Sequence, residues 1–437
     1  MTRSPATWRS RDVWAIALSA FFADWGYQAV LVGFPLFLVL ALRSPVWVFG
    51  LVMAVAYGGG AVASWIGGRL GDRAGHRRVA LAGNSAIPLL SLSGLLAAAA
   101  PAGALLSLGW WARNLRSPSR RAMLTEAVPD EGNRARAFGF LHALDVGGGV
   151  LAALSVLLLL ALHVAFRWIF LATALPLVAS TYALTRATTG RRGQTRGRPP
   201  AAGGPAGPVA PAGPTAHTPT PGADATDPGR SSSPAGRSRA GGFGPAQLLV
   251  AAAALYGFTS YSIGFPVLTV AVGAHARTAG VLAFLLFQAV SAATGYLAGG
   301  RLGRSLVASF RQLALLGYGG AALGALLLGV GAATGAGAPV LLVGVAVLGI
   351  ALGVIETLEP TAMSVLAPSA AAGRGFGALG AARATGVFVG NLVMGLLYVL
   401  GPAYSYGYAA FVGVAAAGIA LAAATRARPE GGVTRPE

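Results

Sequence analysis

Long apolar runs recur along the whole chain, and they limit what the chain can fold into. A helix needs about 20 mostly apolar residues to cross the hydrocarbon core of a bilayer, and many runs reach that length. Of the 437 residues, 55% are hydrophobic and only 10% are charged, whereas soluble proteins carry about 25% charged residues. Too little polar surface remains to cover a water-soluble globule, so we expect an all-α polytopic membrane protein.

The apolar runs predict twelve transmembrane helices in two sets of six, separated by a segment of different composition. The predicted spans are 13–42, 46–66, 79–98, 103–124, 136–161 and 165–185, followed by 246–272, 276–299, 311–334, 339–366, 376–400 and 404–425. The segment between the two sets is mostly Pro, Gly, Ala, Ser, Thr and Arg. It buries too little apolar surface to offset its ordering entropy, so it is predicted to be disordered. The predicted domains are an N-terminal six-helix bundle (1–186), a disordered cytoplasmic linker (187–244), a C-terminal six-helix bundle (245–425) and a cytoplasmic tail (426–437).

Arginine is concentrated in one set of the connections between these spans. That set holds Arg69, Arg73, Arg77, Arg78, Arg134, Arg136, Arg301, Arg304 and Arg374. The opposite set holds only Arg43, Arg167 and Arg277. Cytoplasmic loops carry the excess of positive charge, so both termini and the linker are predicted to be cytoplasmic. This distribution accounts for the net charge of +19 without a nucleic-acid partner, and we predict none.

Three short motifs of the first half recur in the second half in the same order. They are Gly-Phe-Pro at 33–35 and 264–266, Gly-Gly-Arg-Leu-Gly at 67–71 and 299–303, and Arg-x-Phe-Gly at 136–139 and 374–377. Three matches in register are improbable by chance, even in so biased a composition. A parallel duplication of six spans predicts two pseudo-symmetric bundles around a central path.

The connection between the second and third predicted spans carries a family resemblance. It reads Gly-Arg-Leu-Gly-Asp-Arg-Ala-Gly-His-Arg-Arg over residues 68–78, which resembles the signature loop of the major facilitator superfamily. The resemblance implies a facilitator fold in which the first, fourth, seventh and tenth spans line a cavity and the two halves rock. The chain departs from the pattern at His76, where the family has Arg or Lys, and at Arg304, which replaces the aspartate of the second copy.

The acidic residue of this loop, Asp72, is predicted to act in a cytoplasmic gate. A carboxylate there can accept charge-assisted hydrogen bonds from an arginine or a helix N-terminus and hold one conformation. The alternative is a basic turn that only obeys the positive-inside rule. The predicted gate residues are Gly68, Asp72, Arg73, Gly75 and Arg77, together with Asp145 and Arg383, which occupy equivalent repeat positions and can pair across the halves or form structural ion pairs.

A second resemblance lies in the fourth and fifth predicted spans. Residues 113–121 read Arg-Asn-Leu-Arg-Ser-Pro-Ser-Arg-Arg, and Asp145 follows in the next span. This arrangement is similar to a group of bacterial facilitator transporters whose substrates are not unified. It implies a transporter of the bacterial inner membrane and says little about the substrate.

Charged side chains inside the predicted spans are the candidates for transport chemistry. A charge at the bilayer centre costs roughly 2.5–3.5 kcal/mol on insertion scales, so such residues are functional candidates by default. Asp24 and Arg113 fall at similar depth, and we expect them to interact as a proton switch. Glu356 and Glu359 lie one turn apart and cannot both ionise without repulsion, which suits a proton carrier. The predicted substrate and proton pathway is Asp24, Gln28, Arg113, Asn114, Arg116, Glu356 and Glu359.

For each of these charges the alternative is a structural ion pair between neighbouring helices. Arg120, further along the fourth span, is expected to be a surface anchor on the cytoplasmic side rather than part of the pathway.

The sequence favours transport over catalysis. It contains no cysteine, its histidines show no metal spacing, and no Gly-x-x-x-x-Gly-Lys phosphate loop occurs; we therefore predict no enzyme activity, cofactor or metal. The predicted function is secondary active transport of a small solute by a monomer in the lipid bilayer, as proton-coupled efflux of an amphipathic compound. The alternatives are uptake or exchange of an anionic metabolite held by Arg113 and Arg116, or a non-transporting membrane sensor.

Overall fold

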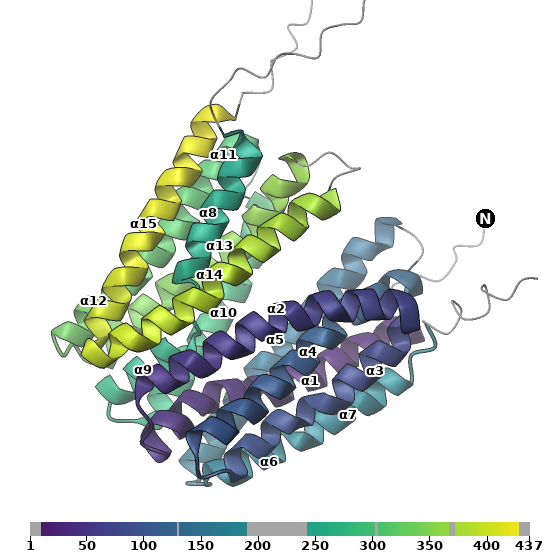
Figure 1. Cartoon of the computed structure of the whole chain (residues 1–437), viewed down its shortest axis with the longest axis horizontal. Helices are drawn as coiled ribbons and strands as arrows, with labels where there is room; N and C mark the ends of the chain where they lie inside the picture. The colour runs from purple at the N-terminus through teal and green to yellow at the C-terminus, as the bar shows by residue number, and fades with distance from the viewer. Residues whose placement is uncertain (1–9, 129–130, 190–242, 302–304, 367–371, 428–437) are drawn as a thin grey trace, which may run out of the picture.

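The computed structural model describes residues 10–128, 131–189, 243–301, 305–366 and 372–427, and these residues are nearly all helical. No strand occurs within those ranges. Figure 1 shows the helices in two groups, one before and one after the undescribed residues 190–242. This is the fold class predicted from the apolar runs. The predicted domain boundaries stay predictions, because most of 187–244 lies outside the described residues.

The first group runs from α1 to α7. Its helices are α1 (Arg11–Pro35), which continues as a π-helical segment (Leu36–Ala41), α2 (Val46–Ala74), α3 (His76–Ala86), which continues as a 3₁₀ segment (Ile87–Leu95), α4 (Ala99–Ala127), α5 (Glu131–Ala161), α6 (Phe166–Ala172) and α7 (Ala174–Thr185). Ser10 caps α1, since its side chain accepts a hydrogen bond from the backbone N–H of Val13 at 3.3 Å. Gly75 ends α2 with a φ of 94°, a conformation that favours glycine.

The second group runs from α8 to α15. Its helices are α8 (Pro245–Thr259), α9 (Gly264–Gly273), α10 (Arg277–Arg301), α11 (Leu306–Gln312), which continues as a π-helical segment (Leu313–Tyr318) into α12 (Gly319–Ala333), α13 (Ala338–Leu366), α14 (Ala372–Leu400) and α15 (Pro402–Arg426). Helical segments therefore lie over each of the twelve predicted spans. The span predicted at 246–272 is interrupted between α8 and α9.

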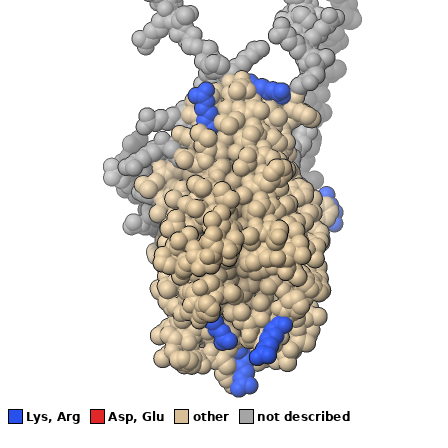
Figure 2. All heavy atoms as spheres, turned by 90° about the vertical axis from the view of Figure 1, so that its left-hand side faces the viewer, with Lys and Arg blue, Asp and Glu red and all other residues tan. Residues whose placement is uncertain are grey.

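Ten helical segments of the described chain are long and apolar enough to cross a membrane. The segments containing α3 and α4 are not among the ten, so the count does not confirm the predicted number of twelve. In α4, four arginines interrupt the apolar composition: Arg113, Arg116, Arg120 and Arg121. On the face drawn in Figure 2, the middle is almost all uncharged, and arginines gather near the two ends and one edge. Large apolar side chains such as Trp65, Leu158 and Phe411 are exposed, which suits contact with lipid.

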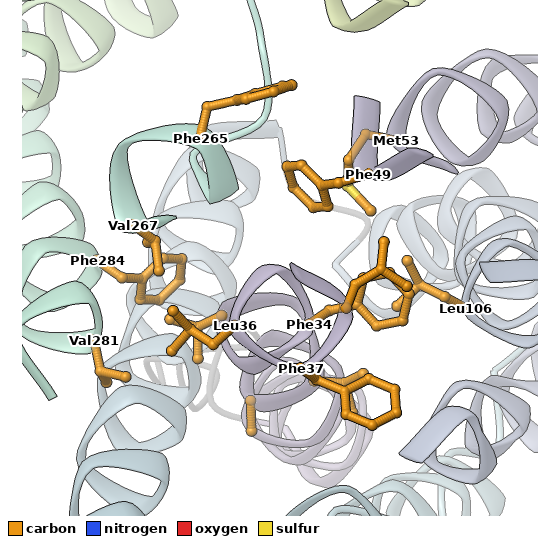
Figure 3. Close-up of a cluster of buried hydrophobic side chains, with 14 of the residues drawn as sticks. Phe34, Leu36, Phe37, Phe49, Met53, Leu106, Phe265, Val267, Val281 and Phe284 are labelled. Atoms are coloured by element: carbon orange, nitrogen blue, oxygen red, sulfur yellow. The ribbon is translucent and has the colours of Figure 1, made fainter. Parts of the chain in front are cut away.

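One hydrophobic core joins the two groups at one end of the molecule. It contains residues from both groups (Figure 3), and the rings of Phe49 on α2 and Phe265 on α9 meet edge to face at 5.0 Å between centroids. Packing there leaves no room for additional atoms. A Cβ on Gly264 would lie 2.3 Å from the ring of Phe49, and one on Gly50 would lie 2.6 Å from the Cα of Gly395.

At the opposite end each group has a core of its own. One core contains only residues between Val13 and Ala187, and the other only residues between Leu249 and Ala427. In Figure 1 the two groups diverge toward this end, where α1 begins and α15 ends. Across the groups, α2 packs against α14 and α5 against α10. The two halves are thus closed at the end that carries Phe49 and separate at the end where α1 begins and α15 ends.

Candidate functional site

The first-half charges predicted to pair are linked through a tyrosine. Tyr27 lies one turn after Asp24 on α1, and its hydroxyl donates to the Asp24 carboxylate at 2.5 Å. The same hydroxyl accepts a hydrogen bond from the Arg113 guanidinium on α4 at 3.2 Å. Asp24 is only 6% exposed. The expected interaction between α1 and α4 is present, but it runs through the Tyr27 hydroxyl rather than as a direct ion pair.

Arg113 is further held by aromatic rings. Its guanidinium lies 5.2 Å from the ring centroid of Tyr27 and 5.0 Å from that of Trp110. Its Nη1 is 3.5 Å from the side-chain oxygen of Asn114, whose amide donates to the Trp110 carbonyl at 2.8 Å. The Nε of Arg113 is buried and has no hydrogen-bond partner among the described residues. No carboxylate of the described residues forms an ion pair with Arg113, so its guanidinium can still donate a hydrogen bond.

The Arg116 side chain does not point to the same place as that of Arg113, although both lie on α4. It is completely buried, and it donates to the side-chain oxygen of Asn84 on α3. Asn84 in turn donates to the hydroxyls of Ser180 at 3.0 Å and Thr181 at 2.8 Å on α7. Arg116 thus belongs to a polar network inside the first bundle, which does not fit the prediction that it holds a substrate beside Arg113.

Arg120 is not the surface anchor that the sequence suggested. Its side chain is 6% exposed, and its Nη2 lies 3.4 Å from the Asp145 carboxylate on α5. The Arg120 side chain points into the first group of helices, and a buried charge there needs a partner of opposite charge. The expectation was wrong because depth along a helix does not tell which way the side chain points.

The second-half charges form one cluster around Arg383 on α14. Its Nη2 donates to Glu356 at 2.8 Å and its Nη1 to Glu359 at 3.3 Å, both on α13. The other oxygen of Glu359 accepts from the Tyr318 hydroxyl at 2.7 Å. The Glu356 side chain is 59% exposed, whereas that of Glu359 is 2% exposed. The two acids that were predicted as a titrating pair share one arginine.

The predicted pairing of Asp145 with Arg383 is absent from this conformation. Asp145 contacts Arg120 within the first half, and Arg383 contacts the two glutamates within the second half. Each charge therefore has its counter-charge inside its own bundle. Sequence symmetry placed the two residues at equivalent positions but could not tell which neighbour each one faces.

Gln28 lies where the two halves meet. A Cβ on Gly149 of α5 would lie 3.9 Å from Cγ of Gln28 on α1 and 3.2 Å from Nε2 of Gln288 on α10. Because Gly149 has no side chain, the amide side chains of Gln28 and Gln288, from different halves, can both pack against it. Gln288 carried no signal in the sequence beyond being a polar residue inside a predicted span.

The signature loop between α2 and α3 is tied to α7 by Arg77. Its Nε donates to the Ala187 carbonyl at 3.1 Å and its Nη2 to the Thr185 carbonyl at 3.0 Å, at the end of α7. Asp72 is 75% exposed, and the His76 ring lies 3.6 Å from its carboxylate, one turn on. Arg73, also exposed, lies in the last turn of α2. The gate role of this loop stays a prediction.

Glycines set how closely α2 approaches α4 beside this loop. A Cβ on Gly67 would lie 2.1 Å from the carbonyl oxygen of Leu115, whereas one on Gly68 would meet only Pro118, at 3.9 Å. Gly67 is therefore a close-packing position, and Gly68 leaves room.

Two hydroxyls that sequence reasoning missed hydrogen-bond to the predicted charges. Tyr27 had a usable signal, because it follows Asp24 by three residues and so lies on the same face of one helix. Tyr318 had none, since it reaches Glu359 from a different helix. Among the described residues, no group of three or more His, Cys, Asp or Glu side chains could hold a metal ion.

Comparison with known proteins identifies the fold. The family model described as Major Facilitator Superfamily matches residues 16–304, and no curated protein matches the chain. Solved structures with a similar fold include a POT family transporter in complex with 5-aminolevulinic acid, at 14% identity and a TM-score of 0.68, covering 94% of this chain and 96% of that one.

Two more structures share the fold. A D-xylose-proton symporter gives 15% identity and a TM-score of 0.69, covering 94% of this chain and 97% of that one. A bacterial homolog of the human lysosomal transporter Spinster, in an inward-facing occupied conformation, gives 13% identity and a TM-score of 0.64, covering 97% of both. With the family match extending over more than half of its length, the chain belongs to the Major Facilitator Superfamily.

Proposed function

We propose that this protein is a secondary active transporter that moves a small solute by alternating access, coupled to protons, and that it exports an amphipathic compound. Family membership supports transport. Because one fold serves many functions, the substrate and the coupling ion have to be argued from the residues of this chain. The proposal includes a bacterial inner-membrane location, cytoplasmic termini and a monomeric state.

The observation that carries proton coupling is the Asp24–Tyr27–Arg113 chain. Asp24 is buried inside a membrane-spanning helix, and its charged partner on α4 reaches it only through the Tyr27 hydroxyl. A carboxylate in this setting can exchange its proton when the hydroxyl or the guanidinium moves away. Glu359, also buried and bonded to a tyrosine and an arginine, is a second exchangeable site in the other half.

The second candidate function is uptake or exchange of an anionic metabolite. Its support is the Arg113 guanidinium, which has a buried nitrogen without a partner in the described parts of the chain and no carboxylate in direct contact. Arg116 does not take part in this version, because its side chain lies in the polar network with Asn84.

Reconstituted protein in liposomes with a pH-sensitive dye inside tests the proposal. A set of amphipathic and anionic compounds is added, and compound-induced proton movement is followed for the wild type, Asp24→Asn and Tyr27→Phe. Asp12→Asn, at the start of the same helix, is the matched control. We expect Asp24→Asn to lose proton-driven accumulation and to retain exchange of labelled compound, because only the proton-binding group is removed. Tyr27→Phe keeps the carboxyl but removes its link to Arg113, so we expect it to weaken accumulation and to retain exchange.

The proposal fails if Asp24→Asn still accumulates a compound against its gradient, since coupling then resides elsewhere. Proton movement with anionic compounds alone favours the second candidate. Specific binding of a compound without any transport would instead favour a membrane sensor.

A further inference from the structure

The helix break between α8 and α9 in the second half is held by specific hydrogen bonds. The backbone leaves the helix after Thr259 and re-enters it at Gly264. The N–H of Ser262 donates to the side-chain oxygen of Asn391 on α14 at 2.8 Å, and the N–H of Gly264 donates to the Ser262 hydroxyl at 3.2 Å. Non-helical backbone at membrane depth is tolerated where it is buried in protein or lines a cavity, and transporters use such breaks for binding.

A cavity of about 300 Å³ opens beside this break. This volume is at the small end of the range of ligand pockets, about 300–1,000 Å³. Aromatic rings supply much of the wall, together with aliphatic side chains and hydroxyls of the break. The lining residues used below are Tyr57, Tyr256, Tyr261, Phe287, Arg383 and Val387.

Two side-chain hydroxyls in this wall, those of Ser260 and Tyr261, have no hydrogen-bond partner among the described residues. The Tyr261 hydroxyl is shielded from solvent, and no described residue hydrogen-bonds to it. A buried hydroxyl in this state is costly unless another group completes its hydrogen bond. A ligand with a hydroxyl or carbonyl oxygen in the cavity would supply that bond.

The charge around the cavity favours a neutral occupant. Arg383 lines the cavity, but both of its outer nitrogens already donate to Glu356 and Glu359. An anion would compete with two carboxylates for this guanidinium. A cation would face the guanidinium rather than the carboxylates, because neither glutamate is among the described residues that line the cavity. A neutral ligand avoids both penalties.

The cavity is connected to the proposed proton site by a row of aromatic rings in edge-to-face contact. Tyr57, its wall on the first half, meets Trp110 edge to face at 5.2 Å between centroids, and Trp110 meets Tyr27 in the same way at 5.7 Å. Tyr27 is the residue that joins Asp24 to Arg113. An occupant that shifts Tyr57 therefore acts on the hydrogen bond that holds Asp24.

We propose that this cavity is the substrate subsite of the second half and that it takes a small, neutral, ring-containing molecule with a hydroxyl or carbonyl that hydrogen-bonds to Tyr261. The inference rests on the proposed function and names its substrate class. The rings and aliphatic side chains contact the apolar body of the ligand, and Tyr261 orients its polar group.

Binding of three probes of one shape and different charge tests the substrate class: naphthol, naphthoate and naphthylmethylammonium, with methylnaphthalene as the analogue without a polar group. Saturable binding to the purified full-length protein is measured by equilibrium dialysis. We expect naphthol to bind at least about 10-fold more tightly than either charged probe, because each charged form meets the Arg383 cluster unfavourably.

Two variants with matched controls locate the binding. Val387→Phe fills the cavity, and Val399→Phe places the same substitution on an exposed position of α14. Tyr261→Phe removes only the hydroxyl, and Tyr404→Phe does so at an exposed site. We expect naphthol affinity to fall at least about 10-fold in Val387→Phe and about 2- to 10-fold in Tyr261→Phe, with both controls unchanged. Methylnaphthalene should bind equally to Tyr261→Phe and the wild type.

Tighter binding of naphthoate, unchanged naphthol affinity in Val387→Phe, or no saturable binding of any probe overturns the inference. Transport is assayed separately in liposomes with the same variants. Naphthol binding that depends on Val387 without any transport leaves the subsite standing and refutes the proposed function. Proton-coupled transport of other compounds that Val387→Phe does not change refutes the subsite and leaves the function standing.

Discussion

Replacing Arg383 with methionine leaves the buried glutamate Glu359 without its positively charged partner. Arg383 donates to Glu356 and to Glu359, whose side chains are 59% and 2% exposed. Methionine keeps a long apolar side chain on α14 and removes the cation. Glu359 then keeps only the Tyr318 hydroxyl as a partner among the contacts described above.

The two ion pairs should contribute very unequally. A pair with an exposed partner is worth about 0–1 kcal/mol, whereas removing one partner of a buried pair costs about 3–5 kcal/mol. We expect Arg383→Met to lower the free energy of unfolding by about 3–5 kcal/mol, mostly through Glu359. Adding Glu359→Gln should recover about 2–3 kcal/mol of this loss, while adding Glu356→Gln should recover less than about 1 kcal/mol.

Unfolding by SDS in mixed micelles, followed by circular dichroism, measures these differences in one double-mutant cycle. Arg311→Met, at an exposed position of α11, controls for the loss of an arginine. Equal rescue by Glu356→Gln and Glu359→Gln would refute the argument from burial, and so would a loss below about 1 kcal/mol in Arg383→Met.

Three further outcomes are expected. Asp72→Asn should reduce turnover in liposomes. Ligand binding and the free energy of unfolding should stay within about 0.5 kcal/mol of the wild type, because an exposed side chain adds little stability. Wild-type turnover in this variant would mean that Asp72 is only a turn residue. Gly67→Ala should lower the free energy of unfolding by about 1–3 kcal/mol through overpacking, whereas Gly68→Ala should leave it unchanged. The same SDS titration measures both. Shortening residues 190–242, which excludes the contacts of Ala187, to about 15 flexible residues should leave expression and transport intact, since such a chain still has reach. Lost folding on that deletion would contradict the linker prediction.

The apolar runs determined the membrane fold class. A continuous apolar segment of this length satisfies its backbone hydrogen bonds in a bilayer as a helix, whereas the strands of a membrane barrel alternate apolar and polar residues. The signature loop at 68–78 and the internal repeat then led to the family that the family model confirms. The same reasoning placed the candidate charges inside the helices, because a polar residue in a long apolar run is visible without any structure. It could not see the break between α8 and α9, where Ser and Tyr fit a helix as well as a loop.

What only the tertiary structure decided is which partner each charge faces. Asp145 contacts Arg120 rather than Arg383, and Arg116 turns away from Arg113 toward Asn84. Helix periodicity fixes the neighbours within one helix, such as Asp24 and Tyr27, since three residues make nearly one turn. Contacts between helices depend on how each helix is rotated and how closely it packs, and close-packed positions such as Gly67 and Gly148 set that rotation through the sum of many weak contacts.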